Sequence, residues 1–272
     1  MERTATVRCS LWPVVPCGIV LASLVLPLTC LGLDDNDEFK ILKAEIETIQ
    51  RGQKETQKAL RGIKDILLGK QPPLDDDVVV TVAGSPVLGN RDTRVAIVEF
   101  TDFECPFCAN YARGTYGQIV TEYVETGKVR YISRNFPLEP PHTDAGRAAE
   151  AALCAKDQGR YWEARDRFLG NQRALAVAGM PDHAAALGLD LPSFRQCFES
   201  RKYKAAVDRD FAEGRDLGVR GTPTFFIGYT DPNDPSRIRA VKLLVGSVAF
   251  RDFQRAIEEV LVEVKQGKRA EP

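Results

Sequence analysis

Cys105 and Cys108 are the two residues of this sequence whose type and spacing point most directly to chemistry. They follow the apolar run 95–100, which predicts a short buried strand, and they open a stretch with helical periodicity. We therefore expect Cys105 in the first turn of a helix, where unpaired backbone N–H groups and the helix dipole favour a thiolate. Cys108 then lies one turn further along the same face, within reach of a mixed disulfide at Cys105. Pro106 fits, because an early helical residue needs no backbone N–H.

Two other interpretations of this cysteine pair are less well supported. A zinc site usually has a second close pair of ligands, whereas the only histidines, His142 and His183, stand alone in the sequence. A purely structural disulfide would close a very short loop and would stabilise the chain little. The sequence therefore predicts a redox pair that needs no metal and no other cofactor.

The composition bounds the kinds of partner. The 272 residues, 44% of them hydrophobic, are enough for a proper core and for an additional extension. Lys and Arg (37) nearly balance Asp and Glu (38), so the chain lacks the electrostatic footprint of a nucleic-acid-binding protein. We expect proteins or small thiols as partners.

The N-terminus predicts an export signal over residues 1–32. Two arginines precede an uncharged stretch whose most apolar part, 18–26, has the length of a signal-peptide core and is short for a membrane span. An uncleaved membrane anchor and a lipid attached to Cys30 remain as alternatives. Removal of this segment leaves four of the seven cysteines, an even number that suits an oxidising compartment.

Residues 33–70 predict a helical stalk that joins two or three copies of the chain. Apolar residues recur there at alternating intervals of three and four, as in a coiled coil. The seam consists of Phe39, Leu42, Ile46, Ile49, Leu60, Ile63 and Leu67, with Gln53 and Thr56 in its middle. Contact between copies is expected over residues 36–68, and the alternative is an amphipathic helix that lies on its own domain. The segment 71–77, which contains two prolines and three aspartates and follows Gly69, predicts a linker.

The remainder predicts an α/β domain with an all-helical insertion. Residues 78–142 suggest strand, helix and strand joined by a parallel crossover. Residues 143–217 are rich in Ala and charged residues and predict helices alone. Residues 218–272 return to strands at 224–227 and 238–245, joined by a loop and followed by a final helix.

Cys154 and Cys197 lie in two of the predicted helices of the insertion. They are too far apart in sequence to form a motif. A disulfide between them would stabilise the insertion by about 2–4 kcal/mol. The alternative is a pair of buried free thiols, which suits an exported protein less well.

The run 221–224, Gly-Thr-Pro-Thr, precedes the returning strand. A proline there cannot donate to the strand ladder, so Pro223 belongs at an edge or a bend, and we expect a cis peptide bond. If the bend faces Cys105, the backbone of Thr222 is free to pair with a substrate peptide.

These features together resemble the thioredoxin superfamily, specifically its DsbA-like branch with a helical insertion, over about residues 78–265. The resemblance rests on Glu99 six residues before Cys105, the run Phe-Glu-Cys-Pro-Phe-Cys at 103–108, the Ala-rich helices with Cys154, and Gly-Thr-Pro-Thr-Phe at 221–225. It implies a thioredoxin fold interrupted by the helical subdomain and preceded by the coiled-coil-like helix.

The resemblance also implies roles for individual residues. Cys105 would attack the substrate and Cys108 would resolve the mixed disulfide. Thr222 with a cis Pro223 would bind the substrate, next to Pro106 and Phe107 between the cysteines. Glu99 would relay the proton of Cys108, unless it is simply an exposed carboxylate at the end of its strand.

Three departures from the strongly oxidising members of this branch favour a different direction of reaction. Phe107 replaces their histidine and supplies no charge to the thiolate, so we expect a less oxidising pair. Thr222, before the proline, replaces their valine, and in this position the sequence resembles the isomerases. The stalk resembles the oligomeric suppressor-of-copper-sensitivity protein C type.

Three hypotheses follow from the sequence. The first is an oligomeric disulfide isomerase or reductase, exported to the periplasm, that acts on cysteine-containing exported proteins and is reset by a membrane thiol-redox partner. The second is a dithiol oxidase that donates the Cys105–Cys108 disulfide to folding proteins. The third is a non-enzymatic binder of Cu(I) or of unfolded chains.

Overall fold

The computed structural model describes residues 35–67, 74 and 78–266, and the chain divides into two units, residues 1–57 and 58–272. The predicted export signal or anchor at 1–32, with Cys30, lies outside the described residues, as does most of the predicted linker at 71–77. Within the described ranges, no helix is both long and apolar enough to cross a membrane.

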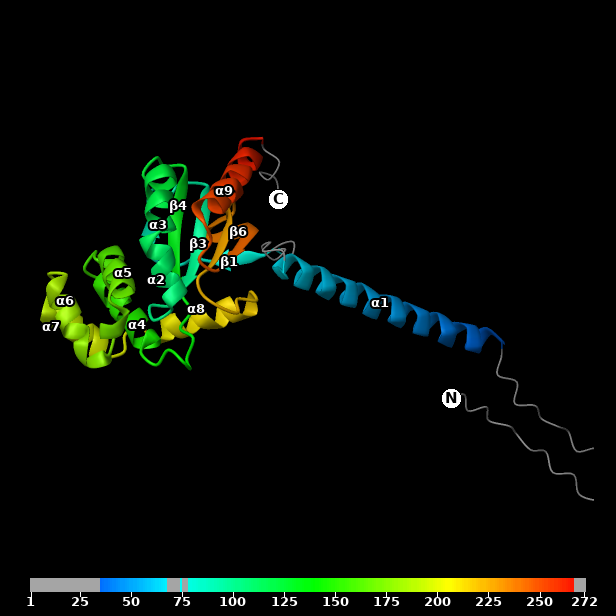
Figure 1. Ribbon diagram of the computed structural model, residues 1–272, viewed down its shortest axis with the longest axis horizontal. Helices are drawn as coiled ribbons and strands as arrows, with labels where there is room; N and C mark the ends of the chain where they lie inside the picture. The colour runs from blue at the N-terminus through cyan, green and yellow to red at the C-terminus, as the bar shows by residue number, and fades with distance from the viewer. Residues whose placement is uncertain (1–34, 68–73, 75–77, 267–272) are drawn as a thin grey trace, which may run out of the picture. The chain divides into compact units, whose positions relative to one another are not determined.

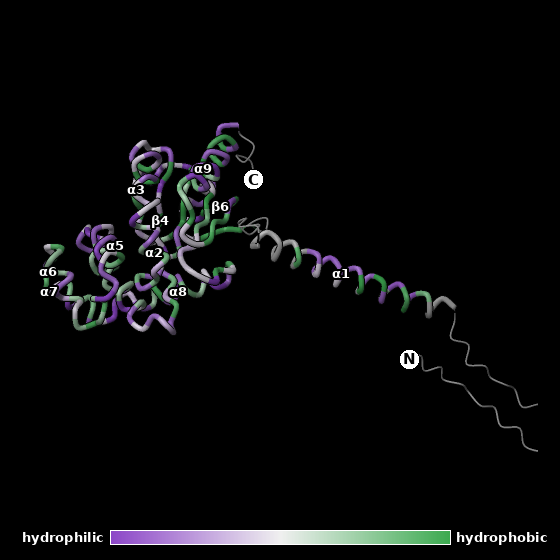
Figure 2. The backbone as a smooth tube through the Cα atoms, in the orientation of Figure 1, coloured by the Kyte–Doolittle hydropathy of each residue, from purple (hydrophilic) through white to green (hydrophobic). Residues whose placement is uncertain are grey.

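Helix α1 spans Asp35–Leu67 and carries the predicted coiled-coil seam (Figure 1). Hydrophobic and hydrophilic residues alternate along it in Figure 2. The described apolar side chains of the seam are all exposed: Phe39, Leu42, Ile46, Ile49 and Leu60, together with the neighbouring Ile41. The structure does not describe the side chains of Ile63 and Leu67. The seam is therefore a row of large apolar groups in contact with solvent in the single chain.

The rest of the described chain is built on one six-stranded sheet with the strand order β1-β6-β5-β3-β4-β2 (Figure 1). The strands are β1 (Val79–Thr81), β2 (Val87–Leu88), β3 (Val95–Thr101), β4 (Val129–Asn135), β5 (Thr224–Asp231) and β6 (Asp234–Val245). β3 and β4 are parallel, with Val95 opposite Val129, and the other pairs are antiparallel. The parallel pair is the predicted crossover, and the carboxyl end of β3 leads to Cys105.

Helices cover both faces of the sheet, which explains why every residue of β3 is buried and why most of them are apolar, with Glu99 as the charged exception. Val95 and Ile97 face a cluster with residues of α2 (Pro106–Arg113), α3 (Thr115–Ile119) and α9 (Phe250–Lys265). Ala96, Val98 and Phe100 face the other cluster, against which α8 (Lys204–Asp216) packs through Phe211. A π-helical turn at Val120–Val124 continues α3.

The insertion contains short helices and, within its described residues, no strand. Its elements are α4 (Ala145–Lys156), α5 (Tyr161–Gly170), α6 (Met180–Ala186), α7 (Leu191–Glu199) and α8, with 3₁₀ turns at Gln172–Ala174 and Val177–Gly179. α4 buries nine residues, eight of them small or apolar and the ninth Glu150, and its alanines allow neighbouring helices to approach closely. The expected α/β class, a thioredoxin-like fold with inserted helices, is confirmed.

The structure corrects the expectation of a loop between strands at 224–227 and 238–245. β5 extends to Asp231 and β6 begins at Asp234, so only two residues separate them. The Asp and Pro residues that predicted a loop form the tight turn itself: the Asp231 carboxylate accepts a hydrogen bond from the Asn233 N–H (2.9 Å) and pairs with Arg239 (3.0 Å). Such turn residues mark a hairpin as readily as a loop.

Candidate active site

Cys105 is the N-cap residue of α2, directly after the end of β3. Its backbone is extended (φ −70°, ψ 120°), its N–H donates to the Asp102 carbonyl (3.2 Å), and Pro106 is the first helical residue. Cys105 is only 3% exposed and Cys108 is fully buried, whereas Pro106 and Phe107 between them are exposed. A substrate therefore meets Phe107 and the edge of the Cys105 sulfur, and Cys108 lies beneath.

The two sulfurs have opposite acid–base character. A hydrogen bond from Cys108 is the largest cause that lowers the pKa of Cys105 from 9.0 to about 6; burial opposes it, and the Thr222 side chain and the backbone N–H groups of Cys108 and Phe107 add to it. Burial raises the pKa of Cys108 well above 9.0, and the negative charges of Cys105 and Glu99 raise it further. Cys105 is the thiolate near neutral pH, and Cys108 remains a thiol.

The Thr222–Pro223 bend faces Cys105. The peptide bond between Thr222 and Pro223 is cis, and the Cys105 sulfur lies 3.2 Å from the Thr222 carbonyl oxygen. The Thr222 hydroxyl is buried without a hydrogen-bond partner among the described residues, so it is available to donate to the thiolate. The Pro223 carbonyl accepts from the Gly246 N–H (2.8 Å), which fixes the bend against the end of β6.

Glu99 lies on β3 and is fully buried, so it is not an exposed carboxylate at a strand end. Its Oε2 accepts hydrogen bonds from the Tyr131 hydroxyl (2.9 Å) and from Arg165 Nη2 (2.9 Å). The Tyr131 hydroxyl also lies 2.9 Å from that of Tyr111 on α2. Glu99 Oε1 has no partner among the described residues. The carboxylate is thus placed where its charge acts on Cys108.

Arg165 is a residue of this site that the sequence did not reveal. It comes from α5 of the insertion, is fully buried, and is the ion-pair partner of Glu99. In the sequence it lies within the charged run 163–167, which is typical of a solvated helix face. Only the packing of the insertion against the sheet brings it to β3.

The turn that carries Cys105 is held by two further side chains that the sequence did not single out. Gln172, just after α5, donates from Nε2 to the carbonyl oxygens of Phe103 and Cys105 (2.8 Å each). Asp102, whose side chain is fully buried, accepts at 2.7 Å from Nδ1 of His142 and at 2.8 Å from the Glu104 N–H. The isolated histidine of the sequence is therefore adjacent to the site.

Cys154 on α4 and Cys197 on α7 are joined by a disulfide with Cα atoms 5.8 Å apart. Both lie in the apolar cluster that also contains Cys105 and Cys108. The disulfide lines a polar pocket of about 590 Å³ with Asp157 and Lys202, an ion pair at 2.7 Å.

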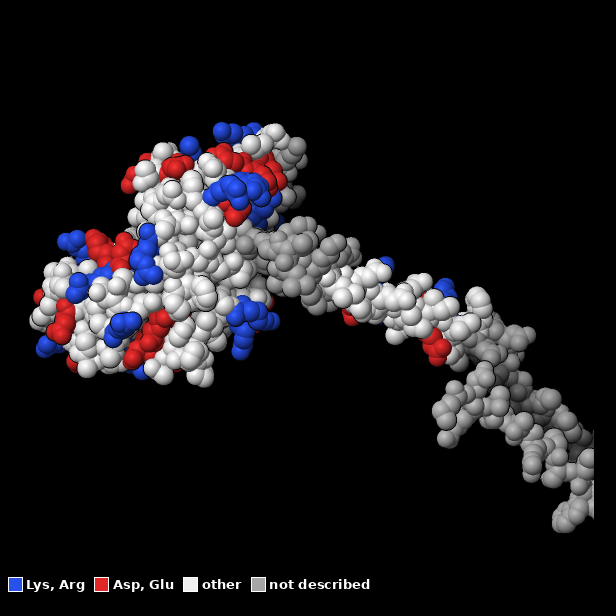
Figure 3. All heavy atoms as spheres, in the orientation of Figure 1, with Lys and Arg blue, Asp and Glu red and all other residues white. Residues whose placement is uncertain are grey.

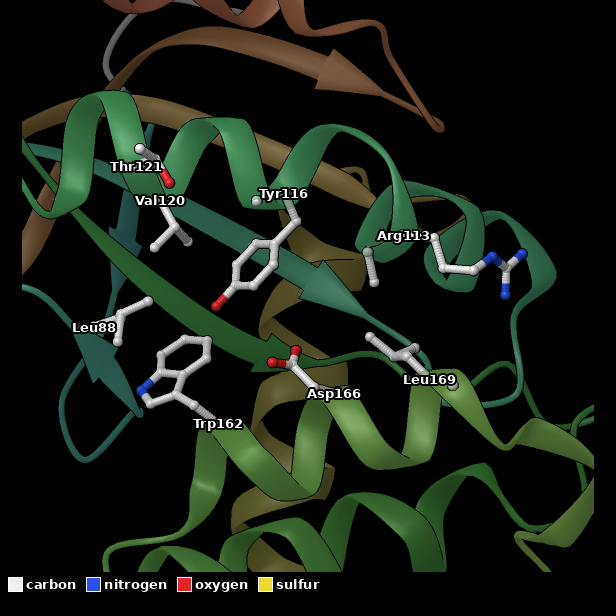
Figure 4. A pocket seen from close by; sticks show the side chains of 11 residues that line it. Leu88, Arg113, Tyr116, Val120, Thr121, Trp162, Asp166 and Leu169 are labelled. Atoms are coloured by element: carbon white, nitrogen blue, oxygen red, sulfur yellow. The ribbon is translucent and has the colours of Figure 1, made fainter.

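A second cleft, of about 510 Å³, lies between α2–α3 and α5 (Figure 4). Tyr116 and Trp162 point into it from opposite sides, and the Asp166 carboxylate lies near the Tyr116 hydroxyl. Asp166 accepts from Nη1 of Arg165 (3.1 Å), so the wall of this cleft is connected through Arg165 to Glu99. Cys105 and Cys108 do not line it.

The described side chains form no further cluster typical of a metal site or, on the face seen in Figure 3, of a surface patch of one charge. On the face that Figure 3 presents, acidic and basic side chains are intermingled. Among the residues that the structure describes, no group of three or more His, Cys, Asp or Glu side chains is arranged to hold a metal ion.

Comparison with known proteins places the chain. A family model described as thioredoxin matches residues 81–245, and the chain belongs to that family. Its fold is similar to that of DsbA1 from Wolbachia pipientis (TM-score 0.58, 21% identity, 68% of this chain and 94% of the other). It is also similar to the catalytic domain of ScsC from Proteus mirabilis (TM-score 0.51, 21% identity, 66% and 90%). The fold is that of the DsbA-like thiol-disulfide oxidoreductases.

A curated relative has a different description. The Na⁺/H⁺ antiporter NhaA 1 of Salinispora arenicola is 35% identical over 191 residues, which are 70% of this chain and 28% of the antiporter. The chain thus spans about a quarter of the length of such relatives.

Proposed function

We propose that this protein is a thiol-disulfide oxidoreductase that works as an oligomeric isomerase or reductase on cysteine-containing exported proteins. The observation that supports this most is the position of the Cys105 sulfur, 3.2 Å from the Thr222 carbonyl oxygen of the bend and beside the exposed Phe107. A polypeptide that pairs with the bend would present its own sulfur to Cys105.

The reaction begins with the Cys105 thiolate. It attacks one sulfur of a client disulfide; the new bond joins Cys105 to the client, and the other client sulfur leaves with the electron pair. For reduction, Cys108 loses its proton and attacks Cys105, so that a Cys105–Cys108 disulfide forms and the client leaves as a thiol. For isomerisation, another thiol of the client resolves the mixed disulfide instead, and Cys105 is regenerated as a thiolate.

The acidity of Cys105 supports the isomerase or reductase direction. The pKa of about 6, with Cys108 as its largest cause, lies between the values of about 7 for thioredoxin and about 3.5 for the strongest oxidase of the family. A more moderate thiolate stabilisation corresponds to a less oxidising pair. A reduced Cys105 is the state that isomerisation requires.

A dithiol oxidase is the second candidate, and the same pKa is the observation that favours it. A thiolate stabilised relative to an ordinary cysteine stabilises the reduced pair, which makes the Cys105–Cys108 disulfide an electron acceptor. In that case α1 would only tether the domain, and the oxidised form would be the active one.

The exposed seam of α1 supports oligomer formation. Five large apolar side chains at coiled-coil spacing are in contact with solvent in the single chain, and burial between copies would remove them from water. Several active sites would then face one client. Export, the client proteins and a membrane partner that reduces the pair belong to the same proposal.

A trapping experiment tests the chemistry. The variant Cys108→Ser lacks the resolving thiol, so we expect mixed disulfides between Cys105 and client proteins to accumulate and to disappear on addition of dithiothreitol. The double variant Cys105→Ser/Cys108→Ser is the control. If Cys108→Ser traps no more protein than the double variant, the oxidoreductase proposal is wrong.

A second experiment tests the oligomer and the direction together. Ile46→Glu/Ile49→Glu places two charges in the seam, whereas Ala44→Glu/Arg51→Glu places the same residues off the seam of the same helix. We expect the seam variant alone to become monomeric in sedimentation analysis and to lose its ability to refold scrambled ribonuclease. Full scrambled-ribonuclease activity in a demonstrated monomer would contradict the oligomeric isomerase and favour the oxidase.

A further inference from the structure

The loop between β4 and α4 contacts the turn that carries Cys105 at three points. Asp102 Oδ2 accepts from the Leu138 N–H (2.8 Å) and from His142 Nδ1 (2.7 Å). Glu104 Oε2 accepts from the Asp144 N–H (2.7 Å). The Asp102 carbonyl accepts from the N–H of Cys105 (3.2 Å). The histidine, the carboxylate and the active-site cysteine therefore belong to one hydrogen-bonded unit.

The Asp102 carboxylate is a buried charge whose compensation comes from this histidine. Its side chain is fully buried, and among the described residues no Lys or Arg forms an ion pair with it. A buried carboxylate without a cationic partner is costly, so the site favours the imidazolium form of His142. Because Nδ1 donates to Asp102, the ring keeps a fixed orientation, and its side chain is 20% exposed.

The charges around His142 agree with this geometry. Burial alone would lower the pKa of His142, but the hydrogen bond and the negative charge of Asp102 outweigh it, and the charges of Cys105 and Glu104 add to them, so that the pKa is raised above 6.5. The Cys105 thiolate thus adds to the negative charge that favours the imidazolium. Interaction between two titrating groups is mutual, so the imidazolium in turn favours the thiolate.

We propose that Asp102 and His142 form an electrostatic dyad that holds a positive charge beside Cys105 and favours its thiolate. Asp102 is a positioning residue, and His142 supplies the charge that Phe107, between the cysteines, lacks. This inference rests on the proposed oxidoreductase function, and it adds a source of thiolate stabilisation outside the Cys-Pro-Phe-Cys segment.

The dyad makes the active site respond to pH in a specific way. Cys105 ionises as pH rises through about 6, and His142 loses its proton at higher pH, since its pKa is raised above 6.5. The thiolate–imidazolium pair therefore exists in the window between these two values. Above that window the thiolate remains but loses its cationic neighbour, and the groups that still favour it are Cys108, the Thr222 side chain and the backbone N–H groups of Cys108 and Phe107.

The direct test is a histidine titration of the untagged full-length wild-type protein in its reduced and oxidised forms. The chain has only two histidines, so selective ¹³C labelling resolves both imidazole signals. We expect the proton affinity of His142 to be about three- to tenfold higher in the reduced form, in which the thiolate is present. His183, which contacts Arg167 and the Ala174 carbonyl, gives the second signal and serves as the internal reference. Equal titration of His142 in the two forms would overturn the proposal.

A pair of variants tests the coupling between His142 and Cys105 through the reactivity of the Cys105 sulfur. In His142→Gln the rate of Cys105 alkylation at pH 6 should fall about two- to fivefold relative to wild type, with the inflection of the pH profile moved upward. His183→Gln removes the other histidine and should leave the profile unchanged. A His142→Gln profile that coincides with that of wild type would contradict the dyad.

Neither measurement requires a client protein. If the titration of His142 depends on the redox state but Cys108→Ser traps no client, the dyad is supported and the proposed function is wrong. If Cys108→Ser traps clients efficiently but the titration of His142 does not depend on the redox state, the proposed function is supported and the dyad is wrong.

Discussion

The two cysteine pairs lie in one apolar cluster but at opposite ends of their helices. Cys105 precedes α2, at the N-terminal end of that helix, whereas Cys154 and Cys197 each lie in the last turn of a helix, at its carbonyl end. The positive end of a helix favours a thiolate and the negative end disfavours it. All four sulfurs are buried, so burial does not distinguish the pairs. The helix end therefore favours reactivity in one pair and a neutral disulfide in the other, and the hydrogen bond from Cys108 adds the largest contribution at Cys105.

The largest expected effect tests the reactive pair. Cys105→Ser removes the nucleophile, so we expect the rate of insulin reduction to fall by at least about a thousandfold with little change in the free energy of unfolding. The double variant Cys154→Ala/Cys197→Ala is the matched comparison and should keep most of the activity at a temperature at which it is folded. If both lose activity equally, the division between a reactive and a structural pair is wrong.

The ion pair between the two regions should give the next largest effect. Glu99→Gln leaves Arg165 of the insertion buried without its main partner, and we expect a loss of about 3–5 kcal/mol in the free energy of unfolding, measured by denaturant titration of the oxidised protein. Glu163→Gln is the control, because its pair with Arg160, the N-cap residue of α5, is about half exposed and should contribute less than about 1 kcal/mol.

A further variant separates the charge from the packing. Glu99→Gln/Arg165→Met removes both charges and should recover much of the stability lost in Glu99→Gln, because a buried apolar pair carries no desolvation cost. If the free energy of unfolding of the double variant is lower than that of Glu99→Gln, then Glu99 and Arg165 stabilise the contact between the sheet and the insertion by packing as well as by charge compensation.

The structural disulfide should give a smaller effect that is confined to stability. In Cys154→Ala/Cys197→Ala the free energy of unfolding should fall by about 2–4 kcal/mol, because the bond closes a loop with a sequence separation of 43. Thermal unfolding with the Cys105–Cys108 pair held reduced in both proteins measures this difference. A loss below about 1 kcal/mol would indicate that packing alone holds α4 against α7.

The comparison also shows which parts of the molecule the sequence predicts. Cys105, Cys108 and the Thr222–Pro223 bend carry local patterns, because a helix start and a proline-led strand impose constraints on neighbouring residues. The α/β class follows for the same reason, since the apolar run of β3 and the Ala-rich α4 differ plainly in period.

The partners of these residues could not be predicted in the same way. Arg165, Gln172 and His142 reach the site only through the packing of the insertion and of the loop before α4, at sequence separations of 40 or more residues from their partners. Nothing in their immediate sequence distinguishes them from solvated side chains. A single helix after Cys105 was also too simple a prediction, because Gly114 separates α2 from α3.

The smallest expected effect sharpens the difference between the two helix ends. Phe107→His places an imidazole between the cysteines at an exposed position, 62% accessible in the wild type, at the positive end of α2. Below the pKa of the new histidine its charge should favour the Cys105 thiolate and lower the pKa of Cys105 by about half a unit to one unit, with solvent exposure limiting the gain. Alkylation rates between pH 4 and pH 7 measure this shift.

The control for this substitution is Phe107→Gln, which removes the aromatic ring and adds no charge. If Phe107→Gln lowers the pKa of Cys105 as much as Phe107→His, then loss of the apolar ring, and better hydration of the sulfur, account for the change. If Phe107→His alone lowers it, and the gain disappears as pH rises through the pKa of the new histidine, the charge is the cause. Phe107→His should lower the pKa of Cys105 less in the presence of a protonated His142 than in a His142→Gln background. The reason is that two cations that act on one thiolate also repel each other.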